Sequence, residues 1–237
     1  MQLEGVRPIA PLILKLSGLL LTALGALWAV LVIQAPTDSM QGMVQKIIYV
    51  HVPCAITSYL GFAITAVSGA LYLWKNQDRF DRVAAAGAEV GVIFCTLTIL
   101  TGPIWARATW GHWWAWDPRL TVTLMLWFIY LAYLLLRSFT EGSARTARFA
   151  AVYGMVGLFA VPLNYFAIDL FGGAAMHPEN LERGSLGAGM RLPFMIGLVT
   201  GMMALVHLVL LRADLGARRV LAAASGELRA KEGEFTP

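Results

Sequence analysis

The chain has 237 residues, of which 58% are hydrophobic and 14% charged, and its formal net charge is +4. A soluble domain has about 25% charged residues, so 18 Lys and Arg with 14 Asp and Glu are too few to cover the surface of one. The composition therefore predicts an integral membrane protein. It excludes a disordered chain, which would have low hydrophobicity and a high net charge. It also excludes a disulfide scaffold, because the chain has only two cysteines.

Six apolar stretches are long enough to cross a bilayer as helices, which requires about 20 mostly apolar residues each. They run over approximately 11–33, 53–74, 84–105, 119–136, 149–170 and 193–211. The first stretch is longer than the roughly 7–15 apolar residues of a signal peptide, so we expect it to remain as a helix. The fold prediction is an all-α membrane protein with one six-helix domain over residues 1–211 and a short cytoplasmic tail over 212–237.

Lys and Arg are distributed unequally between the two sets of loops. Twelve lie near the two termini and after the second and fourth spans, whereas five lie after the first, third and fifth spans. Because cytoplasmic loops carry the excess of positive charge, both termini are predicted to be cytoplasmic. The segments 34–52, 105–118 and 171–192 then face the outer side. The same bias accounts for the net positive charge, so no nucleic-acid partner is predicted.

The first outer segment contains a capping cluster, Thr37-Asp38-Ser39, followed by apolar residues at helical spacing. These residues are Met40, Met43, Val44, Ile47 and Ile48. The pattern predicts a short amphipathic helix on the membrane surface. His51 continues its apolar face toward the bundle, and Pro53 is expected to begin the second span.

Tryptophan is concentrated in the second outer segment. Five of the eight tryptophans lie there within twelve residues: Trp105, Trp110, Trp113, Trp114 and Trp116. Five indoles in one loop form a flat apolar surface, which suits a large planar ligand or the docking of another protein. The alternative is an aromatic belt at the membrane interface.

Two charged residues follow these tryptophans. Asp117 precedes Pro118, and this pair is typical of the start of a helix, because the Asp side chain caps the free N–H groups and proline fits the first helical position. Arg119 is placed to reach an acidic group on a ligand, with snorkelling to lipid phosphate as the alternative.

Two histidines, His51 and His177, flank the tryptophan-rich segment and are predicted to lie on the same side of the membrane. A six-coordinate heme iron accepts two axial imidazole nitrogens, so the pair is a candidate for such ligands, and a hydrogen-bonded structural histidine is the alternative for each. His112, within the tryptophan-rich segment, is a third candidate without an assigned role. His207, in the sixth span, is expected to pair with Glu89 in the third.

Other chemistry is weakly represented in the sequence. Cys54 and Cys95 lie within or at the edge of spans without the spacing of a zinc or thiol redox motif, so we interpret them as small apolar residues. No carboxylate pair, Ser/His/Asp grouping or phosphate-binding loop is recognisable. The chain is therefore predicted to be a binding and transfer protein rather than an enzyme, with any energy coupling supplied by a partner.

The run Trp110-Gly-x-Trp113-Trp114-x-Trp116-Asp117-Pro-Arg-Leu resembles the tryptophan-rich (WWD) motif of the heme-handling proteins of cytochrome c maturation. With six spans and with His51 and His177 in the first and third outer segments, the chain is similar to the heme exporter protein C (CcmC) family. The resemblance implies heme b at the periplasmic face of a bacterial inner membrane, with His51 and His177 as axial ligands. The residues implied to cradle it are Trp110, Trp113, Trp114, Trp116, Asp117 and Arg119.

The resemblance also implies partners. A membrane-tethered heme chaperone (CcmE-like) would receive heme on its own histidine, and two ABC-transporter subunits (CcmA- and CcmB-like) and a small membrane subunit (CcmD-like) would associate with the chain. At the outer boundary the heme ring can lie on tryptophan while its propionates reach Arg119, Arg183 or Arg191.

Three other functions are alternatives to this one. A heme-ligating cytochrome c synthase belongs to the same superfamily but has more spans and further histidines. A membrane cytochrome b-type redox subunit usually places its histidine pairs in facing helices. A heme channel is disfavoured, because the polar residues Asn164, Glu89 and His207 do not form a continuous path through the spans.

Overall fold

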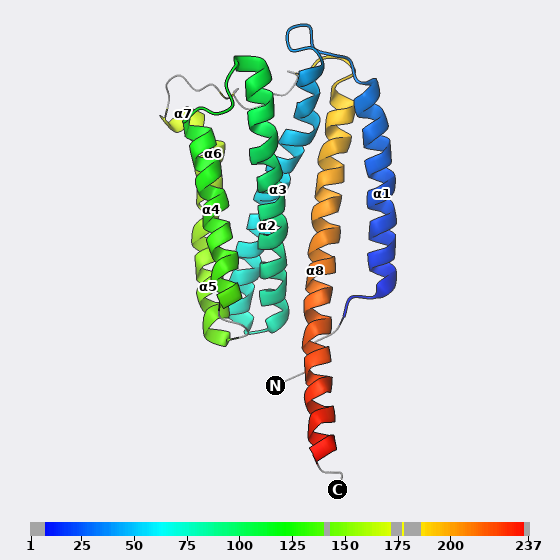
Figure 1. Ribbon diagram of the computed structural model, residues 1–237, viewed down its shortest axis with the longest axis vertical. Helices are drawn as coiled ribbons and strands as arrows, with labels where there is room; N and C mark the ends of the chain where they lie inside the picture. Colours follow the sequence, from blue (N-terminus) through cyan, green and yellow to red (C-terminus); the bar gives the residue numbers. More distant parts are fainter. Residues whose placement is uncertain (1–7, 140–142, 172–176, 178–185, 235–237) are drawn as a thin grey trace.

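The computed structural model describes residues 8–139, 143–171, 177 and 186–234. Six helical segments in this part of the chain are long and apolar enough to cross a membrane, and they stand side by side as a bundle (Figure 1). The prediction of an all-α protein with six membrane spans is confirmed.

Nine helical elements are described. In chain order they are α1 (Pro11–Gln34), the 3-10 helix η1 (Met43–Ile47), α2 (Ile48–Lys75), α3 (Asp78–Trp110), α4 (Pro118–Phe139), α5 (Ala144–Leu158), α6 (Ala160–Tyr165), α7 (Ala167–Phe171) and α8 (Arg191–Glu234). The fifth span consists of α5 and α6 together, over Ala144–Tyr165.

The first outer segment differs from its prediction, because residues 35–42 form a loop instead of the start of a surface helix. Gly42 has a φ of 59°, which lies outside the helical range. The apolar stripe is therefore interrupted there, and helix begins only at Met43, as the short 3-10 helix that runs directly into α2.

Asp38 nevertheless accepts hydrogen bonds from nearby backbone N–H groups, as expected of a residue in the capping cluster. Its Oδ1 accepts the backbone N–H groups of Gln41 and Met40, each at 2.8 Å. These two hydrogen bonds favour the carboxylate and hold the pKa of Asp38 below its ordinary value. The cluster therefore stabilises a turn rather than a helix start.

Two helices extend further than the sequence predicted. α2 begins at Ile48 and passes through Pro53 without a break, because a single missing N–H is tolerated in a span where neighbouring helices pack around it. α8 has 44 residues, which makes it about 66 Å long, and it includes residues 212–234 of the predicted tail. Figure 1 shows α8 projecting beyond the other helices toward the C-terminus.

At the centre of the bundle, α2 packs against α3, α5 and α8, while α1 packs against α8. Small residues make the α2–α3 contact close. A Cβ built on Gly61 of α2 would lie 2.8 Å from the Cα of Gly91 on α3 and 3.0 Å from the carbonyl oxygen of Gly87. Next to this crossing, the rings of Phe62 and Tyr130 stack at a centroid distance of 3.7 Å, so α4 joins the same core.

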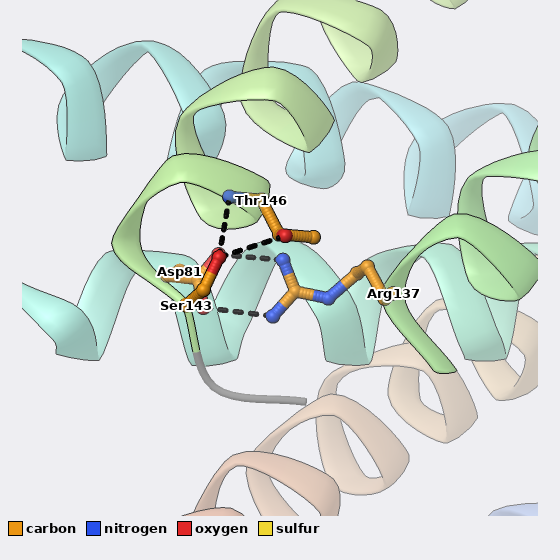
Figure 2. Close-up of polar contacts among 4 residues, drawn as sticks. All are labelled: Asp81, Arg137, Ser143 and Thr146. Carbon is orange, nitrogen blue, oxygen red and sulfur yellow. Dashed lines mark hydrogen bonds and ion pairs between the residues drawn. The ribbon is translucent and has the colours of Figure 1, made fainter. Parts of the chain in front are cut away.

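Ion pairs connect the helices near the end of the bundle where the second and fourth spans finish. Arg137 of α4 donates two hydrogen bonds to the carboxylate of Asp81 on α3, at 2.6 and 2.7 Å. Figure 2 shows this pair beside the start of α5, where Ser143 accepts the N–H of Thr146 and thereby caps the helix.

The predicted partnership of His207 with Glu89 is wrong. Glu89 binds Arg212 of α8, with Nη2 of the arginine 2.6 Å from Oε1. The Nδ1 of His207 lies instead 2.9 Å from the hydroxyl of Ser17 on α1. His207 therefore joins α8 to α1, and the Glu89 carboxylate joins α8 to α3.

Candidate functional site

The segments predicted to face outward meet at one end of the bundle. This end contains the connection from α1 to α2, the connection from α3 to α4, the end of α7 and the start of α8 (Figure 1). The sequence-predicted site residues that the structure describes lie in or beside these connections.

His51 lies in the first turn of α2 and its side chain faces α3, with the residue only 9% exposed. A Cβ built on Gly102 of α3 would lie 3.3 Å from Cε1 of the imidazole, so the absence of a side chain at Gly102 leaves room for the ring. The indole of Trp105, one turn further along α3, meets the imidazole edge-on at a centroid distance of 5.9 Å. The ring is thus held between two helices.

The hydrogen bonds around Thr101 favour one tautomer of His51. The Thr101 hydroxyl donates to the carbonyl oxygen of Leu97 at 2.7 Å, and a hydroxyl has one proton to give. Its contact with Nδ1 of His51, at 2.9 Å, therefore has the imidazole N–H as donor. The neutral ring then carries its lone pair on Nε2, which is the form a histidine needs to bind a metal.

His177 lies close to His51, with the two ring centroids 6.3 Å apart and the ring planes inclined by 38°. The backbone N–H of His177 donates to Oδ2 of Asp117 at 3.2 Å. Its Nδ1 lies 3.5 Å from Nη1 of Arg119. The structure thus brings together two imidazoles that are 126 positions apart in the sequence.

Asp117 and Arg119, at the start of α4, both contact His177, and both are buried. Oδ1 of Asp117 accepts the N–H of Leu120 at 2.8 Å, so the predicted helix cap is confirmed and the second carboxylate oxygen remains for His177. Nη2 of Arg119 donates to the carbonyl oxygen of Tyr165 at 2.7 Å, which ties α4 to the end of α6. Buried charges need hydrogen-bond partners. Asp117 has the backbone N–H groups of Leu120 and His177, and Arg119 has the carbonyl oxygen of Tyr165.

The tryptophan-rich segment between α3 and α4 presents its indoles differently. Trp113 and Trp116 are 60% and 75% exposed. Trp114 contacts Trp116 edge-on at a centroid distance of 5.7 Å, and its Nε1 is buried without a hydrogen-bond partner among the described residues. Trp110 is the last residue of α3, and the next residue, Gly111, ends the helix with a φ of 84°. The segment therefore exposes the indole rings of Trp113 and Trp116 at the end of the bundle that contains His51 and His177.

Not every predicted contact lies within the described part of the site. Arg183 falls outside it. Arg191, at the start of α8, donates to the carbonyl oxygen of Leu186, and no described contact joins it to either histidine. Arg119 is therefore the one of the three predicted propionate partners that the structure places beside His177.

Sequence reasoning missed Thr101 and Gly102, which position His51. The signal that points to them is the run Thr101-Gly102-Pro103, where a hydroxyl, a residue without a side chain and a proline interrupt an apolar span. Such residues are tolerated in a membrane helix where a neighbouring group uses the space or the hydrogen bond.

A buried polar cluster below the site was also underestimated. Asn164 of α6 is fully buried; its side-chain amide donates to Thr123 of α4 at 2.8 Å and its oxygen accepts the hydroxyl of Tyr59 on α2 at 3.1 Å. Thr123 in turn donates to the carbonyl oxygen of Arg119. The cluster links α2, α4 and α6 directly beneath the residues that hold His177.

Comparison with known proteins gives a consistent result over most of the chain. Residues 3–225 match the family model described as heme exporter protein C. Heme exporter protein C of Paracoccus denitrificans is 30% identical over 88% of this chain and 88% of its own length. The protein of the same name from Bradyrhizobium diazoefficiens is 32% identical over 78% of this chain and 72% of its own length.

A relative from a plant organelle is similar over a shorter region. A ccmC-like mitochondrial protein of cytochrome c biosynthesis from Marchantia polymorpha is 36% identical, and the alignment covers 57% of this chain and 57% of the relative. The chain therefore spans little more than half the length of that relative, but most of the length of the two bacterial ones.

Proposed function

The chain belongs to the heme exporter protein C family, a component of heme delivery for cytochrome c maturation, and we propose that it holds heme between His51 and His177 and passes it to a membrane-tethered chaperone. The observation that carries this proposal is the pairing of the two imidazoles, with centroids 6.3 Å apart, at the end of the bundle that bears the tryptophan-rich segment.

The spacing of the rings suits a shared iron. A histidine nitrogen binds a metal at about 2 Å, and the ring centroid lies about 1 Å behind that nitrogen, so two axial imidazoles on one iron have centroids about 6 Å apart. His51 already has its Nδ1–H engaged with Thr101, which is the arrangement in which ligating histidines are usually held. A porphyrin would supply the four remaining ligands of a six-coordinate iron, as in heme b.

The neighbouring residues suit the rest of a heme. The exposed indoles of Trp113 and Trp116 offer apolar faces to the ring. Arg119 offers a cation to a propionate, and the Nε1 of Trp114, which has no hydrogen-bond partner among the described residues, offers a donor. Asp117 supports the site indirectly, because its carboxylate holds the backbone of His177 and the start of α4 together.

We place this site on the periplasmic side of a bacterial inner membrane, with both termini cytoplasmic, because 12 of the 18 Lys and Arg lie on the other side. A CcmE-like chaperone would approach from the periplasm and meet the exposed tryptophans. CcmA- and CcmB-like ABC subunits and a CcmD-like small subunit complete the proposed assembly and would supply the energy coupling. The chain itself is then a binding and transfer component.

A redox subunit of the cytochrome b type fits the site less well. Such proteins hold heme between histidines of facing spans. Here His51 lies in the first turn of α2 and His177 lies between α7 and α8, so the pair is at the edge of the bundle, where a partner protein has access.

The transfer step is tested by removing two indoles. In cells that produce the chaperone, Trp114→Ala with Trp116→Ala should lower the amount of chaperone carrying covalent heme at least fivefold, a larger loss than that of the heme that copurifies with the chain. Heme staining of the chaperone and the absorbance of the purified chain measure the two quantities. Trp74→Ala is the matched control, because Trp74 is 80% exposed on the last turn of α2, at the other end of the bundle.

Two results would contradict the transfer role. Unchanged heme on the chaperone in the double variant would mean that these indoles take no part in handover. Equal losses of copurified heme and chaperone heme would mean that they only hold the heme.

A further inference from the structure

A cavity of about 180 Å³ lies at the end of the bundle opposite the two histidines. Four arginines line it: Arg82 of α3, Arg137 of α4, and Arg212 and Arg219 of α8. The predicted function gives no role to so many cations in one place.

The spacing of the lining residues explains why the cavity exists. Arg82 and Glu89 are seven residues apart on α3, and Arg212 and Arg219 are seven apart on α8, so each pair lies on one face of its helix. Between them the facing positions are small: Ala85 and Ala86 on α3 and Gly216 on α8. The helices therefore pack with arginines around a gap that no side chain fills.

The charges around the cavity do not balance. Arg137 is paired with Asp81, and Arg212 is paired with Glu89. Arg82 and Arg219 form no ion pair or side-chain hydrogen bond within the part of the chain that the structure describes. Four arginines with two carboxylates leave a formal charge of +2, so the cavity favours an anion.

Depth and size define the kind of anion. Arg82 and Gly102, beside His51, are 20 residues apart on α3, which is about 30 Å along the helix and equals the thickness of the hydrocarbon core of a bilayer, about 30 Å. The arginines thus lie at the level of the lipid headgroups. Pockets that enclose drug-sized ligands have about 300–1,000 Å³, so this cavity admits a phosphate group but not a whole nucleotide or heme.

We propose that this cavity binds the phosphate group of an anionic phospholipid from the leaflet opposite the heme site. Arg82 and Arg219 would donate to the phosphate oxygens, and the ion-paired Arg137 and Arg212 would form the walls. Basic pockets between helices at this level are suited to anionic headgroups. A bound lipid, whose phosphodiester carries one negative charge, would lower the formal charge of the cavity from +2 to +1 and join α3 to α8.

The test titrates the purified full-length protein in detergent with short-chain phosphatidylglycerol and follows its melting temperature. We expect saturable stabilisation, with phosphatidylcholine binding at least tenfold more weakly because its choline cation is repelled by the arginines. Inorganic phosphate, tested in parallel, should also bind at least tenfold more weakly, because it lacks the acyl chains. The double variant Arg82→Gln with Arg219→Gln should lose at least tenfold in affinity for phosphatidylglycerol.

The matched control is Arg79→Gln with Arg145→Gln, which removes two exposed cations from the same end of the bundle but outside the cavity. It should change the affinity less than threefold. Gly216→Leu is a second variant that keeps all charges and fills the cavity, since a Cβ at Gly216 already lies 3.3 Å from Cδ of Arg82. It should also lose at least tenfold.

Three outcomes would overturn the proposal. Equal losses in the double variant and its control would show a diffuse effect of charge. Stabilisation by phosphatidylcholine equal to that by phosphatidylglycerol would show that no anionic headgroup is selected, and equal stabilisation by inorganic phosphate would show a site for a free anion. None of these results depends on heme, so the proposed function stands or falls separately.

Discussion

The proton of a single hydroxyl decides how His51 presents its ring. When Thr101 gives that proton to the carbonyl oxygen of Leu97, the hydroxyl oxygen accepts from Nδ1 of His51. The lone pair on Nε2 is thereby fixed without any acidic residue.

Replacing Thr101 tests this arrangement. Thr101→Val keeps the shape of the side chain and removes the acceptor, so His51 loses its orienting hydrogen bond. We expect heme affinity to fall about 10- to 100-fold, as is usual when such an outer partner of a metal ligand is removed. Titration with heme, followed by visible absorbance, measures the change, and Thr101→Ser should restore affinity. Wild-type affinity in Thr101→Val would show that the tautomer is set elsewhere.

Among single residues, the sequence singled out the candidate ligands but not the residues that contact them. His51, His177 and Asp117 stand out because their residue types are rare in apolar or outer segments. Thr101 and Gly102 do not, because the pairing of α2 with α3 leaves no periodic signal across 50 positions. The roles of the site residues as heme ligands and heme contacts remain predictions.

The wrong pairing of His207 with Glu89 has a geometric cause. Depth in the membrane places both residues at a similar level, but depth does not determine the direction in which a side chain points. His207 and Arg212 are five residues apart on α8, so they point about 140° away from each other around the helix. His207 therefore faces Ser17 of α1, and Arg212 faces Glu89.

Among the helices, the close crossing of α2 and α3 carries the site, because His51 and Thr101 lie on its two sides. Gly87 and Gly91 are spaced as expected for a close helix contact, and the structure places Gly61 of α2 against both. The sequence thus predicts that α3 has a close neighbour, although it does not predict which helix this is.

Gly61→Ala tests the importance of this crossing. The added Cβ would lie 2.8 Å from backbone of α3, so the helices must separate, and we expect destabilisation of about 1–3 kcal/mol, as for overpacking in a core, with weaker heme binding. Thermal unfolding in detergent measures the first effect. Gly25→Ala is the control, since a Cβ there meets nothing within 4 Å. Equal melting temperatures for the two variants would contradict the proposed contact.

The boundaries of the helices were less predictable than their existence. Hydropathy identifies a span because about 20 apolar residues are needed to cross the bilayer. It does not show that Gly42 adopts a positive φ and delays the helix, or that α8 continues through residues 212–234. These ends depend on local backbone conformation and on helix beyond the membrane.

Across the whole molecule, the two ends of the bundle have different chemistry. One end holds the paired histidines, the exposed tryptophans and the buried Asp117 and Arg119. The other holds the arginine-lined cavity. Loop charges and residue types predicted which loops carry the histidines and tryptophans and which carry most of the positive charge, but they predicted neither the cavity nor the burial of Asp117 and Arg119. The packing of α2 between α3, α5 and α8 was not predictable, since it depends on which small residues face one another.

The most direct test of the proposed heme site is the visible absorption spectrum of the purified protein loaded with heme. The wild type should show a six-coordinate heme, and His51→Ala with His177→Ala should lose that spectrum while remaining folded. His207→Ala, which removes an imidazole paired with Ser17 far from the site, should keep it. A six-coordinate spectrum that survives in the double variant, or one that is lost in His207→Ala, would contradict ligation by His51 and His177.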